Sequence, residues 1–225
     1  MQSSTRRRAT RTASSTFVAD VDAVIFDLDG TLWDTSAACA VGWNRVVERH
    51  AIPFRAITED DVRSVAGRPH DECIRTVFDG LDDAEVRTLI DQTTIEDNDI
   101  VAQAGGVLYS GVAAVLRRLA RRYPLFIVSN CQAGYIESFL AWSGFAALFR
   151  DVECWGNTGE PKTENLRRLL ARNGLRRPVF VGDGEGDREA ARANGIPFVH
   201  VAYGFGSCAP GERCVRAFAE LEVEI

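Results

Sequence analysis

Two aspartates separated by one residue, Asp27 and Asp29, directly follow a short apolar run at 23–26. Such a run predicts a buried parallel strand, and open α/β sheets bind ligands at the carboxyl ends of their strands. In the turn after the strand, two carboxylates can converge on one reacting group, while Gly30 lets the backbone bend close to an anion. The alternative is a polar turn without a chemical role, which polar residues at other strand ends disfavour.

Those other strand ends carry polar residues in the same way. Ser129 and Asn130 follow an apolar run at 125–128, and Asp183 lies two positions after a run at 179–181. Because carboxyl ends of parallel strands share one edge of a sheet, we expect all of these side chains to lie close together. Weaker strand candidates are 151–154 and 198–201.

Helical patterns separate the strand candidates. Apolar residues at positions 112, 115, 116 and 119 form one stripe, and leucines at 166, 169 and 170 form another before Gly174. A further helix is expected at 189–194, ending before Gly195. Strands that alternate with helices predict an α/β fold, a doubly wound Rossmann-like parallel sheet with right-handed crossovers.

The stretch from 35 to 105 departs from this alternation, because it shows helical segments and no convincing strand. Thr58 and Asp61 form a capping-box pattern, a break at 67–69 ends that helix, and an amphipathic segment follows from about Asp83. We interpret 35–105 as an inserted α-helical cap domain and 20–34 with 106–225 as the α/β core domain. Residues 1–19 are expected to be a flexible basic tail, with an organellar transit peptide as the alternative.

Taken together, the polar motifs resemble the haloacid dehalogenase superfamily, in particular its phosphoglycolate-phosphatase-like and β-phosphoglucomutase-like subgroup with a helical cap. The matching segments are Asp-Leu-Asp-Gly-Thr at 27–31, Ser-Asn at 129–130, Gly-Glu-Pro-Lys at 159–162, and Gly-Asp at 182–183 with Asp187. The likeness extends from about position 21 to the C-terminus, and the joint pattern is far more specific than any single motif. It implies a Mg²⁺-dependent phosphatase that hydrolyses a small-molecule phosphate monoester through an aspartyl-phosphate intermediate.

The resemblance assigns Asp27 as the nucleophile and Asp29 as the general acid and base. Oxygen ligands suit Mg²⁺, and the implied metal ligands are Asp27, Asp29 through its backbone carbonyl, Asp183 and Asp187. For the last of these positions, Glu185 competes with Asp187. The implied phosphate-binding residues are Gly30, Ser129, Asn130 and Lys162.

Substrate selection is expected from the loop between cap helices. The resemblance places Gly67, Arg68 and His70 there, over the leaving group. Arg68 either binds a substrate carboxylate or second phosphate, or is an exposed loop arginine. The acid at position 29 favours phosphatases or mutases over true dehalogenases. Two alternatives stay open: a phosphosugar mutase of the β-phosphoglucomutase type, and a catalytically silent binding protein.

Composition narrows the possible partners. The formal net charge of −6 offers no basic surface for nucleic acid, and no apolar run is long enough to cross a membrane. Six cysteines without a Cys-x-x-Cys pair fit a reducing compartment. We therefore expect a cytoplasmic monomer or homodimer whose partner is a small phosphorylated metabolite.

Overall fold

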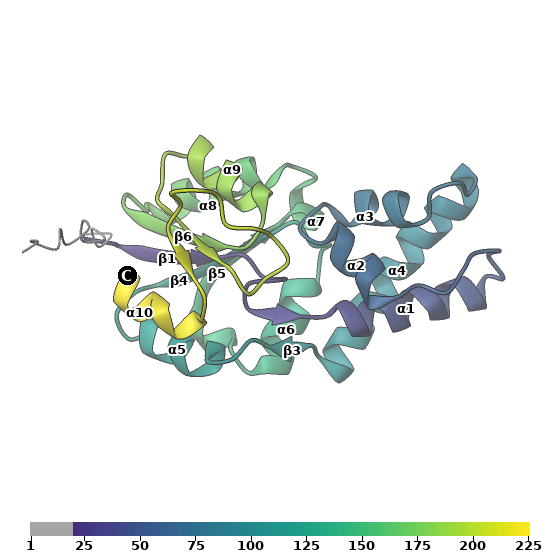
Figure 1. Ribbon diagram of the computed structural model, residues 1–225, viewed down its shortest axis with the longest axis horizontal. Helices are drawn as coiled ribbons and strands as arrows, with labels where there is room; N and C mark the ends of the chain where they lie inside the picture. Colours follow the sequence, from purple (N-terminus) through teal and green to yellow (C-terminus); the bar gives the residue numbers. More distant parts are fainter. Residues whose placement is uncertain (1–19) are drawn as a thin grey trace, which may run out of the picture.

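The computed structural model describes residues 20–225, so the predicted tail at 1–19 lies outside the described residues (Figure 1). Six parallel strands form one sheet in the order β5-β4-β1-β6-β7-β8. They are β1 (Ala23–Phe26), β4 (Leu125–Ser129), β5 (Phe149–Cys154), β6 (Pro178–Gly182), β7 (Phe198–Val201) and β8 (Cys214–Val215). The predicted parallel α/β fold is confirmed, and β1 lies between β4 and β6, so the three polar strand ends are neighbours.

Strand β1 is buried on both faces, because its alternate side chains enter two different clusters. Val24 and Phe26 pack on the side of α5, α6 and α10, while Ala23 and Ile25 pack on the side of α8 and α9. Figure 1 shows these two sets of helices on opposite faces of the sheet. Their bounds are α5 (Val112–Leu119), α6 (Tyr135–Ser143), α8 (Lys162–Asn173), α9 (Glu185–Ala193) and α10 (Leu221–Glu224).

All five predicted strands form, and the apolar stripe of α5 is fully buried as expected. The helix expected at 189–194 instead begins at Glu185 and ends at Ala193. Its first turn carries acidic residues and no apolar stripe, so periodicity could not reveal it. Short elements also escaped prediction: β8, α7 (Trp155–Thr158) and the 3-10 turns Ala146–Leu148 and Phe218–Glu220.

The predicted helical insertion contains four helices: α1 (Ser36–Arg49), α2 (Glu59–Val65), α3 (His70–Val77) and α4 (Asp83–Ala104). The capping box at Thr58 is present, since its hydroxyl accepts a hydrogen bond from the Asp61 amide at 3.2 Å. These helices bury a hydrophobic cluster of their own, centred on Trp43, Ile74 and Phe78. In Figure 1 they extend beyond one end of the sheet.

A two-stranded antiparallel ribbon stands where the chain enters and leaves the insertion. It consists of β2 (Trp33–Asp34) and β3 (Val107–Leu108), with Trp33 paired to Leu108. Two-residue strands are too short to produce a sequence pattern, which is why the ribbon was not predicted.

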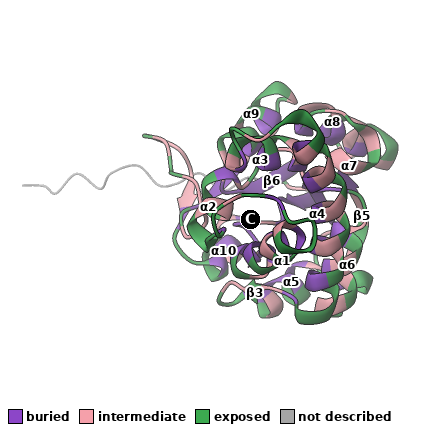
Figure 2. Ribbon diagram, turned by 90° about the vertical axis from the view of Figure 1, so that its right-hand side faces the viewer, coloured by how far each residue is buried: buried purple, intermediate pink, exposed green. Residues whose placement is uncertain are grey.

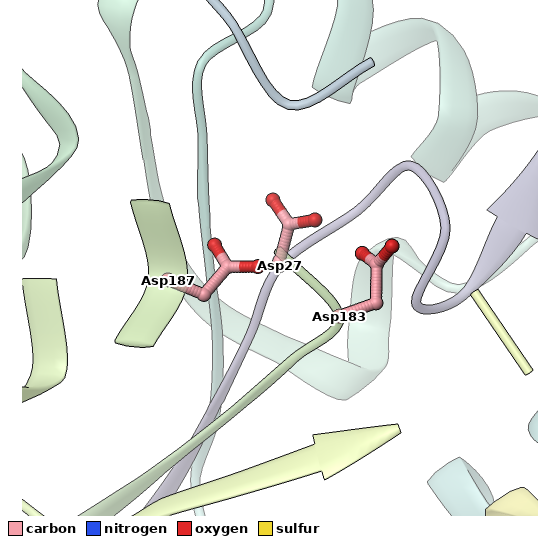
Figure 3. Close-up of side chains that lie close together, drawn as sticks. All are labelled: Asp27, Asp183 and Asp187. Atoms are coloured by element: carbon pink, nitrogen blue, oxygen red, sulfur yellow. The ribbon is translucent and has the colours of Figure 1, made fainter. Parts of the chain in front are cut away.

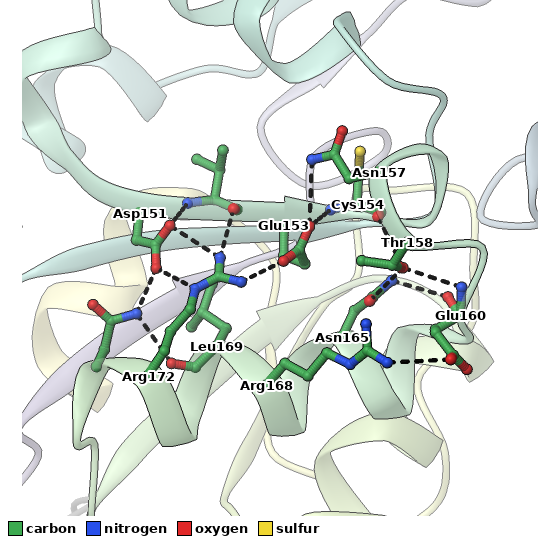
Figure 4. A network of polar contacts seen from close by, with 12 residues as sticks. Asp151, Glu153, Cys154, Asn157, Thr158, Glu160, Asn165, Arg168, Leu169 and Arg172 are labelled. Atoms are coloured by element: carbon green, nitrogen blue, oxygen red, sulfur yellow. Dashed lines mark hydrogen bonds and ion pairs between the residues drawn. The ribbon is translucent and has the colours of Figure 1, made fainter.

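Burial follows this layered arrangement, with the strands buried and the outward faces of the helices exposed (Figure 2). Arg172 of α8 fastens that helix to strand β5, because its guanidinium pairs with Asp151 at 2.7 Å and with Glu153 (Figure 4). Between residues 20 and 225 there is no helix with the length and apolar character that crossing a membrane requires.

Candidate active site

Three buried carboxyl groups meet at the carboxyl edge of the sheet. Oxygen atoms of Asp27, Asp183 and Asp187 lie within 4.8 Å of one another. Asp27 directly follows β1, Asp183 directly follows β6, and Asp187 lies in the first turn of α9. Figure 3 shows the three side chains beside one another. The structure thus brings together carboxylates that are up to 160 positions apart in the sequence, from 27 to 187.

Lys162 supplies the positive charge of this group. Its Nζ lies 2.7 Å from Oδ1 of Asp27 and 2.6 Å from Oδ1 of Asp187. Burial alone would lower the pKa of Lys162, but the adjacent charges of Asp187 and Asp27 raise it above its ordinary value. The two carboxylates therefore favour the charged ammonium form of the side chain. It is also the only lysine of the chain, since 25 of the 26 lysine and arginine residues are arginine.

The loop before Lys162 is fixed by hydrogen bonds. The Thr158 hydroxyl donates to Oδ1 of Asn165 at 2.7 Å, and the Asn165 amide donates to the Glu160 carbonyl at 2.9 Å (Figure 4). Asn165 is fully buried in the first turn of α8. These contacts fix the loop that leads into α8, the helix that begins with Lys162.

One ammonium does not balance three buried carboxyl groups. Burial and the charge of Asp187 raise the pKa of Asp27 well above its ordinary value, despite the opposing effect of Lys162. Burial and Asp187 likewise raise the pKa of Asp183 to about 6. A cation bound among these oxygen atoms would relieve this repulsion. A purely oxygen donor set fits a hard divalent cation, as the sequence motifs had indicated.

Asp183 is held in place from several sides. Its Oδ2 accepts the backbone amides of Phe205 at 2.6 Å and Gly206 at 3.1 Å, and its Oδ1 accepts the Thr31 hydroxyl at 3.3 Å. Gly30 has a φ of +83°, and a Cβ there would lie 2.5 Å from the Asp183 carboxylate. Sequence reasoning missed Phe205, although a Gly-Phe-Gly segment after the last long strand was a usable signal.

Asp29 lies beside the acidic group, which consists of Asp27, Asp183 and Asp187, and it has its own hydrogen-bonding partners. The Tyr135 hydroxyl donates to its Oδ1 at 3.0 Å, and the Thr35 hydroxyl lies 3.2 Å from the same atom. Burial raises the pKa of Asp29 to about 6, against the lowering effect of these two hydrogen bonds. Sequence reasoning did not find Thr35 or Tyr135, because neither belongs to a recognisable motif.

The structure places Asp187 and Glu185, the two candidates for the last metal ligand, in different surroundings. Oδ2 of Asp187 accepts the Gly184 amide at 2.9 Å and caps α9, while its Oδ1 faces Lys162. The side chain of Glu185 is 72% exposed and pairs with Arg188. Asp187 therefore joins the acidic group and Glu185 does not.

Ser129 and Asn130 connect the sheet edge with the helical insertion. Ser129 is buried, and both residues line a cavity of about 80 Å³ that also reaches Asp27 and Asp29. The side-chain amide of Asn130 donates to the Gly67 carbonyl at 2.8 Å. The loop after α2 is thereby tied directly to the end of β4.

The three predicted cap residues also line this cavity, but in different settings. Gly67 and Arg68 lie in the loop after α2, and the exposed Arg68 side chain contacts the Thr76 hydroxyl at 3.4 Å. His70 is not a loop residue, because it begins α3 and is only 6% exposed. Its Nε2 lies 2.9 Å from the Thr93 hydroxyl, and burial lowers its pKa to about 4.

Comparison with known proteins shows which family the chain resembles. The sequence model of the family described as haloacid dehalogenase-like hydrolase matches residues 24–201. A phosphoglycolate phosphatase of Synechococcus elongatus is 30% identical over 190 residues, which cover 82% of this chain and 85% of the relative. A phosphoglycolate phosphatase of Rhodobacter capsulatus is 29% identical over 193 residues, covering 81% and 85%.

Solved structures resemble the whole fold. A crystal structure described as a predicted phosphoglycolate phosphatase from Haemophilus somnus superposes with a TM-score of 0.81 at 23% identity, covering 90% of this chain and 97% of the other. A haloacid dehalogenase-like hydrolase from Bacteroides fragilis superposes with a TM-score of 0.77 at 22% identity, covering 90% and 100%. At these identities the likeness concerns the fold alone.

Proposed function

We propose that this chain, which belongs to the haloacid dehalogenase-like hydrolase family and is a phosphatase, is Mg²⁺-dependent and hydrolyses small phosphate monoesters through an aspartyl-phosphate at Asp27. The observation that carries the proposal is the position of Asp27, paired with Lys162 at 2.7 Å at the edge of a cavity that Asp29 also lines. Nucleophile, countercharge and proton carrier would then surround the same bound phosphoryl group.

In the first step a carboxylate oxygen of Asp27 forms a bond to phosphorus, and the bond from phosphorus to the ester oxygen breaks. Asp29, raised to a pKa of about 6, gives its proton to the departing alkoxide. In the second step Asp29 takes a proton from water, and the resulting hydroxide attacks phosphorus. Phosphate then leaves, Asp27 regains its carboxylate, and Asp29 is protonated again.

The other residues of the site would stabilise negative charge on the phosphoryl group. Lys162, the Ser129 hydroxyl and the backbone amides near Asn130 and Gly30 are suited to the phosphoryl oxygens, where negative charge spreads in the transition state. Bound Mg²⁺ would offset the charge that an anionic nucleophile and an anionic phosphoryl group bring together. Its proposed ligands are the carboxylates of Asp27, Asp183 and Asp187 and the backbone carbonyl of Asp29.

Helices α1–α4 are proposed to act as the cap that excludes water from the reacting group. Their separate hydrophobic cluster and the ribbon at their junction with the core support a unit that can move as a whole. Gly67, Arg68 and His70 are proposed to face the leaving group of a small phosphorylated metabolite, since all three line the cavity.

The proposal is tested by measuring phosphate release from p-nitrophenyl phosphate by the full chain, with Mg²⁺ and with excess EDTA. We expect turnover only with the metal. When a reaction with phosphate-labelled substrate is quenched in acid, we expect the label on a peptide that contains Asp27. Asp27→Asn keeps the shape of the side chain but removes the nucleophile. Residual activity of this variant above about a hundredth of wild type would contradict the assigned role.

A further inference from the structure

Asn130 joins the core domain to the loop after α2. It directly follows β4, beside the buried Ser129, and its Nδ2 donates to the Gly67 carbonyl at 2.8 Å. Its Oδ1 is buried without a hydrogen-bond partner, so among the described residues the Gly67 contact alone orients the side-chain amide. Because a carbonyl oxygen accepts and cannot donate, the contact requires a hydrogen-bond donor on the side chain at position 130.

The loop itself is shaped by contacts within the helical insertion. The Arg68 amide donates to the Val65 carbonyl at 3.3 Å, and the Cys73 thiol of α3 donates to the same carbonyl at 3.2 Å. Gly67 has a φ of +84°, and a Cβ there would meet no atom within 4 Å, so the glycine serves the turn of the backbone. The Gly67 carbonyl is thus an acceptor whose position is set by the insertion.

The other side of the insertion is attached to the core more broadly. Near the C-terminal end of α4, Ile100 and Val101 are buried in the hydrophobic cluster of the core. On the same stretch, Nδ2 of Asn98 donates to the Ala133 carbonyl at 2.8 Å. Apolar burial of this kind persists when one hydrogen bond is lost. We therefore expect the end of α4, which is followed by β3 of the ribbon, to act as the hinge.

The loop side is fastened at far fewer points. Between residues 66–69 and the core domain, the described residues form one hydrogen bond, that of Asn130. Arg63 of α2 also pairs with Asp34 at 3.0 Å, but its side chain is 41% exposed and Asp34 belongs to the ribbon. Exposed pairs of this kind contribute little. The contact that keeps the loop over the cavity therefore adjoins the proposed phosphate site.

We propose that Asn130 is a positioning residue that couples occupation of the phosphate site to closure of the helical insertion. Its backbone lies in the turn that is suited to the phosphoryl oxygens, and its side chain holds the loop after α2. A phosphoryl group that orders this turn also fixes the donor for the Gly67 carbonyl, so binding and closure favour each other. The inference rests on the proposed function and deepens it by naming the contact that closes the site.

Two cysteines of the insertion can report on closure. Cys39 of α1 and Cys73 of α3 line the cavity and are 6% and 8% exposed, whereas Cys208 of the core is exposed. Buried thiols of this kind are inert towards alkylating reagents. Alkylation of Cys39 and Cys73 therefore requires the insertion to move away from the core.

The test measures how fast N-ethylmaleimide modifies Cys39 and Cys73 of the full chain, with Mg²⁺ alone and with Mg²⁺ plus saturating inorganic phosphate. Peptide mass spectrometry gives the rate at each cysteine. In the wild-type chain we expect phosphate to slow modification by at least about fivefold, the lower end of the usual coupling between two sites. Absence of protection by phosphate in the wild-type chain would overturn the inference.

Asn130→Ala removes the donor and leaves the backbone that is suited to phosphate. Without phosphate its modification rate should rise about 3 to 10-fold, the worth of one hydrogen bond, and phosphate should protect it less than about twofold. Asn130→Leu keeps roughly the shape of the side chain without a donor, and it decides if Asn130→Ala fails to fold. Protection in the variant equal to that in wild type would overturn the inference.

Asn98→Ala is the matched control, because Asn98 also donates to a backbone carbonyl of the core at 2.8 Å, but on the hinge side. It should keep the protection by phosphate, and the rate at Cys208 should be the same in all of these proteins. Loss of protection in Asn98→Ala as well would show that any weakened attachment opens the insertion, and the assignment to Asn130 would fall.

Phosphate release from p-nitrophenyl phosphate, measured on the same preparations, separates the two proposals. Absence of release by the wild-type chain would remove the proposed function, whatever the alkylation rates are. Release by the wild-type chain, together with equal protection by phosphate in wild type and Asn130→Ala, would remove only this inference.

Discussion

The phenol oxygen of Tyr135 lies 3.0 Å from Oδ1 of Asp29 and 2.7 Å from the hydroxyl oxygen of Thr35, which itself lies 3.2 Å from the same carboxylate atom. The three side chains come from α6, the loop before α1 and the turn after β1. Two hydroxyls on one oxygen fix the rotation of the Asp29 carboxyl group. Tyr135 is therefore expected to orient the proposed proton carrier without touching the reacting atoms.

Tyr135→Phe should lower kcat about tenfold or more on an alkyl phosphate, because a basic alkoxide needs a well-placed proton donor. The loss on p-nitrophenyl phosphate should be small, because its leaving group needs little protonation. Steady-state kinetics on both esters measure the contrast. Tyr203→Phe, whose hydroxyl donates to the Thr31 carbonyl at 2.9 Å, serves as control. Equal losses on the two esters would assign Tyr135 a purely structural role.

Asp183→Asn should raise the Mg²⁺ concentration for half-maximal activity by roughly 10 to 100-fold, the usual effect of impairing a metal site. The side chain is held by the amides of Phe205 and Gly206, so the variant cannot readily rearrange. Titration of activity with Mg²⁺ checks this. Glu185→Gln should behave like wild type because that side chain is 72% exposed, and a comparable shift in this variant would refute our choice of Asp187 over Glu185.

Lys162→Met should destabilise the metal-free protein by about 3–5 kcal/mol, because it leaves buried carboxylates without their countercharge. Chemical unfolding in EDTA measures the loss, and added Mg²⁺ should restore more stability to the variant than to wild type. Arg167→Met on the same helix, with a side chain 63% exposed, should change stability little. A variant as stable as wild type in EDTA would show that Lys162 does not balance the acidic group.

Asp97 should make stability depend on pH. Burial raises its pKa from the ordinary 3.8 to about 8, so the folded protein binds more protons than the unfolded chain between these values. The contribution of Asp97 to stability is therefore complete below pH 4 and is lost as the pH rises through about 8. Burial lowers the pKa of His70 from 6.5 to about 4, so this residue makes stability rise with pH in that range. Above pH 6.5 His70 no longer changes the stability.

Between pH 6.5 and 8 only Asp97 of these two residues should change the stability. As the pH rises through this range, we expect the free energy of unfolding of Asp97→Asn to increase by on the order of 1–2 kcal/mol relative to that of wild type. The free energy of unfolding, measured at both pH values for wild type, Asp97→Asn and Asp99→Asn, checks this. Parallel pH dependence of all three proteins would mean that Asp97 is ionised in the folded state.

Sequence patterns predicted which polar residues meet at one edge of the sheet, because residues such as Asp27, Ser129 and Asp183 follow apolar runs that are visible in the sequence and belong to neighbouring strands. They did not reveal Tyr135 or Asp97, because these approach Asp29 and the cavity from helices 106 and 68 positions further along the chain. Periodicity identifies the buried face of a helix, but it does not tell which polar side chain on that face lies at the candidate site. His70 was expected in a loop, yet Pro69 directly precedes the first turn of α3.

The solitary lysine has a practical consequence for chemical labelling. An amine-selective acylating reagent finds one side-chain target in this sequence, and that amine is 4% exposed and enclosed by two carboxylates. Acylation of Lys162 requires the ammonium to lose its proton and leave those partners, so the folded protein should react very slowly there. The rate of modification then reports on the opening of the site, without any engineered probe.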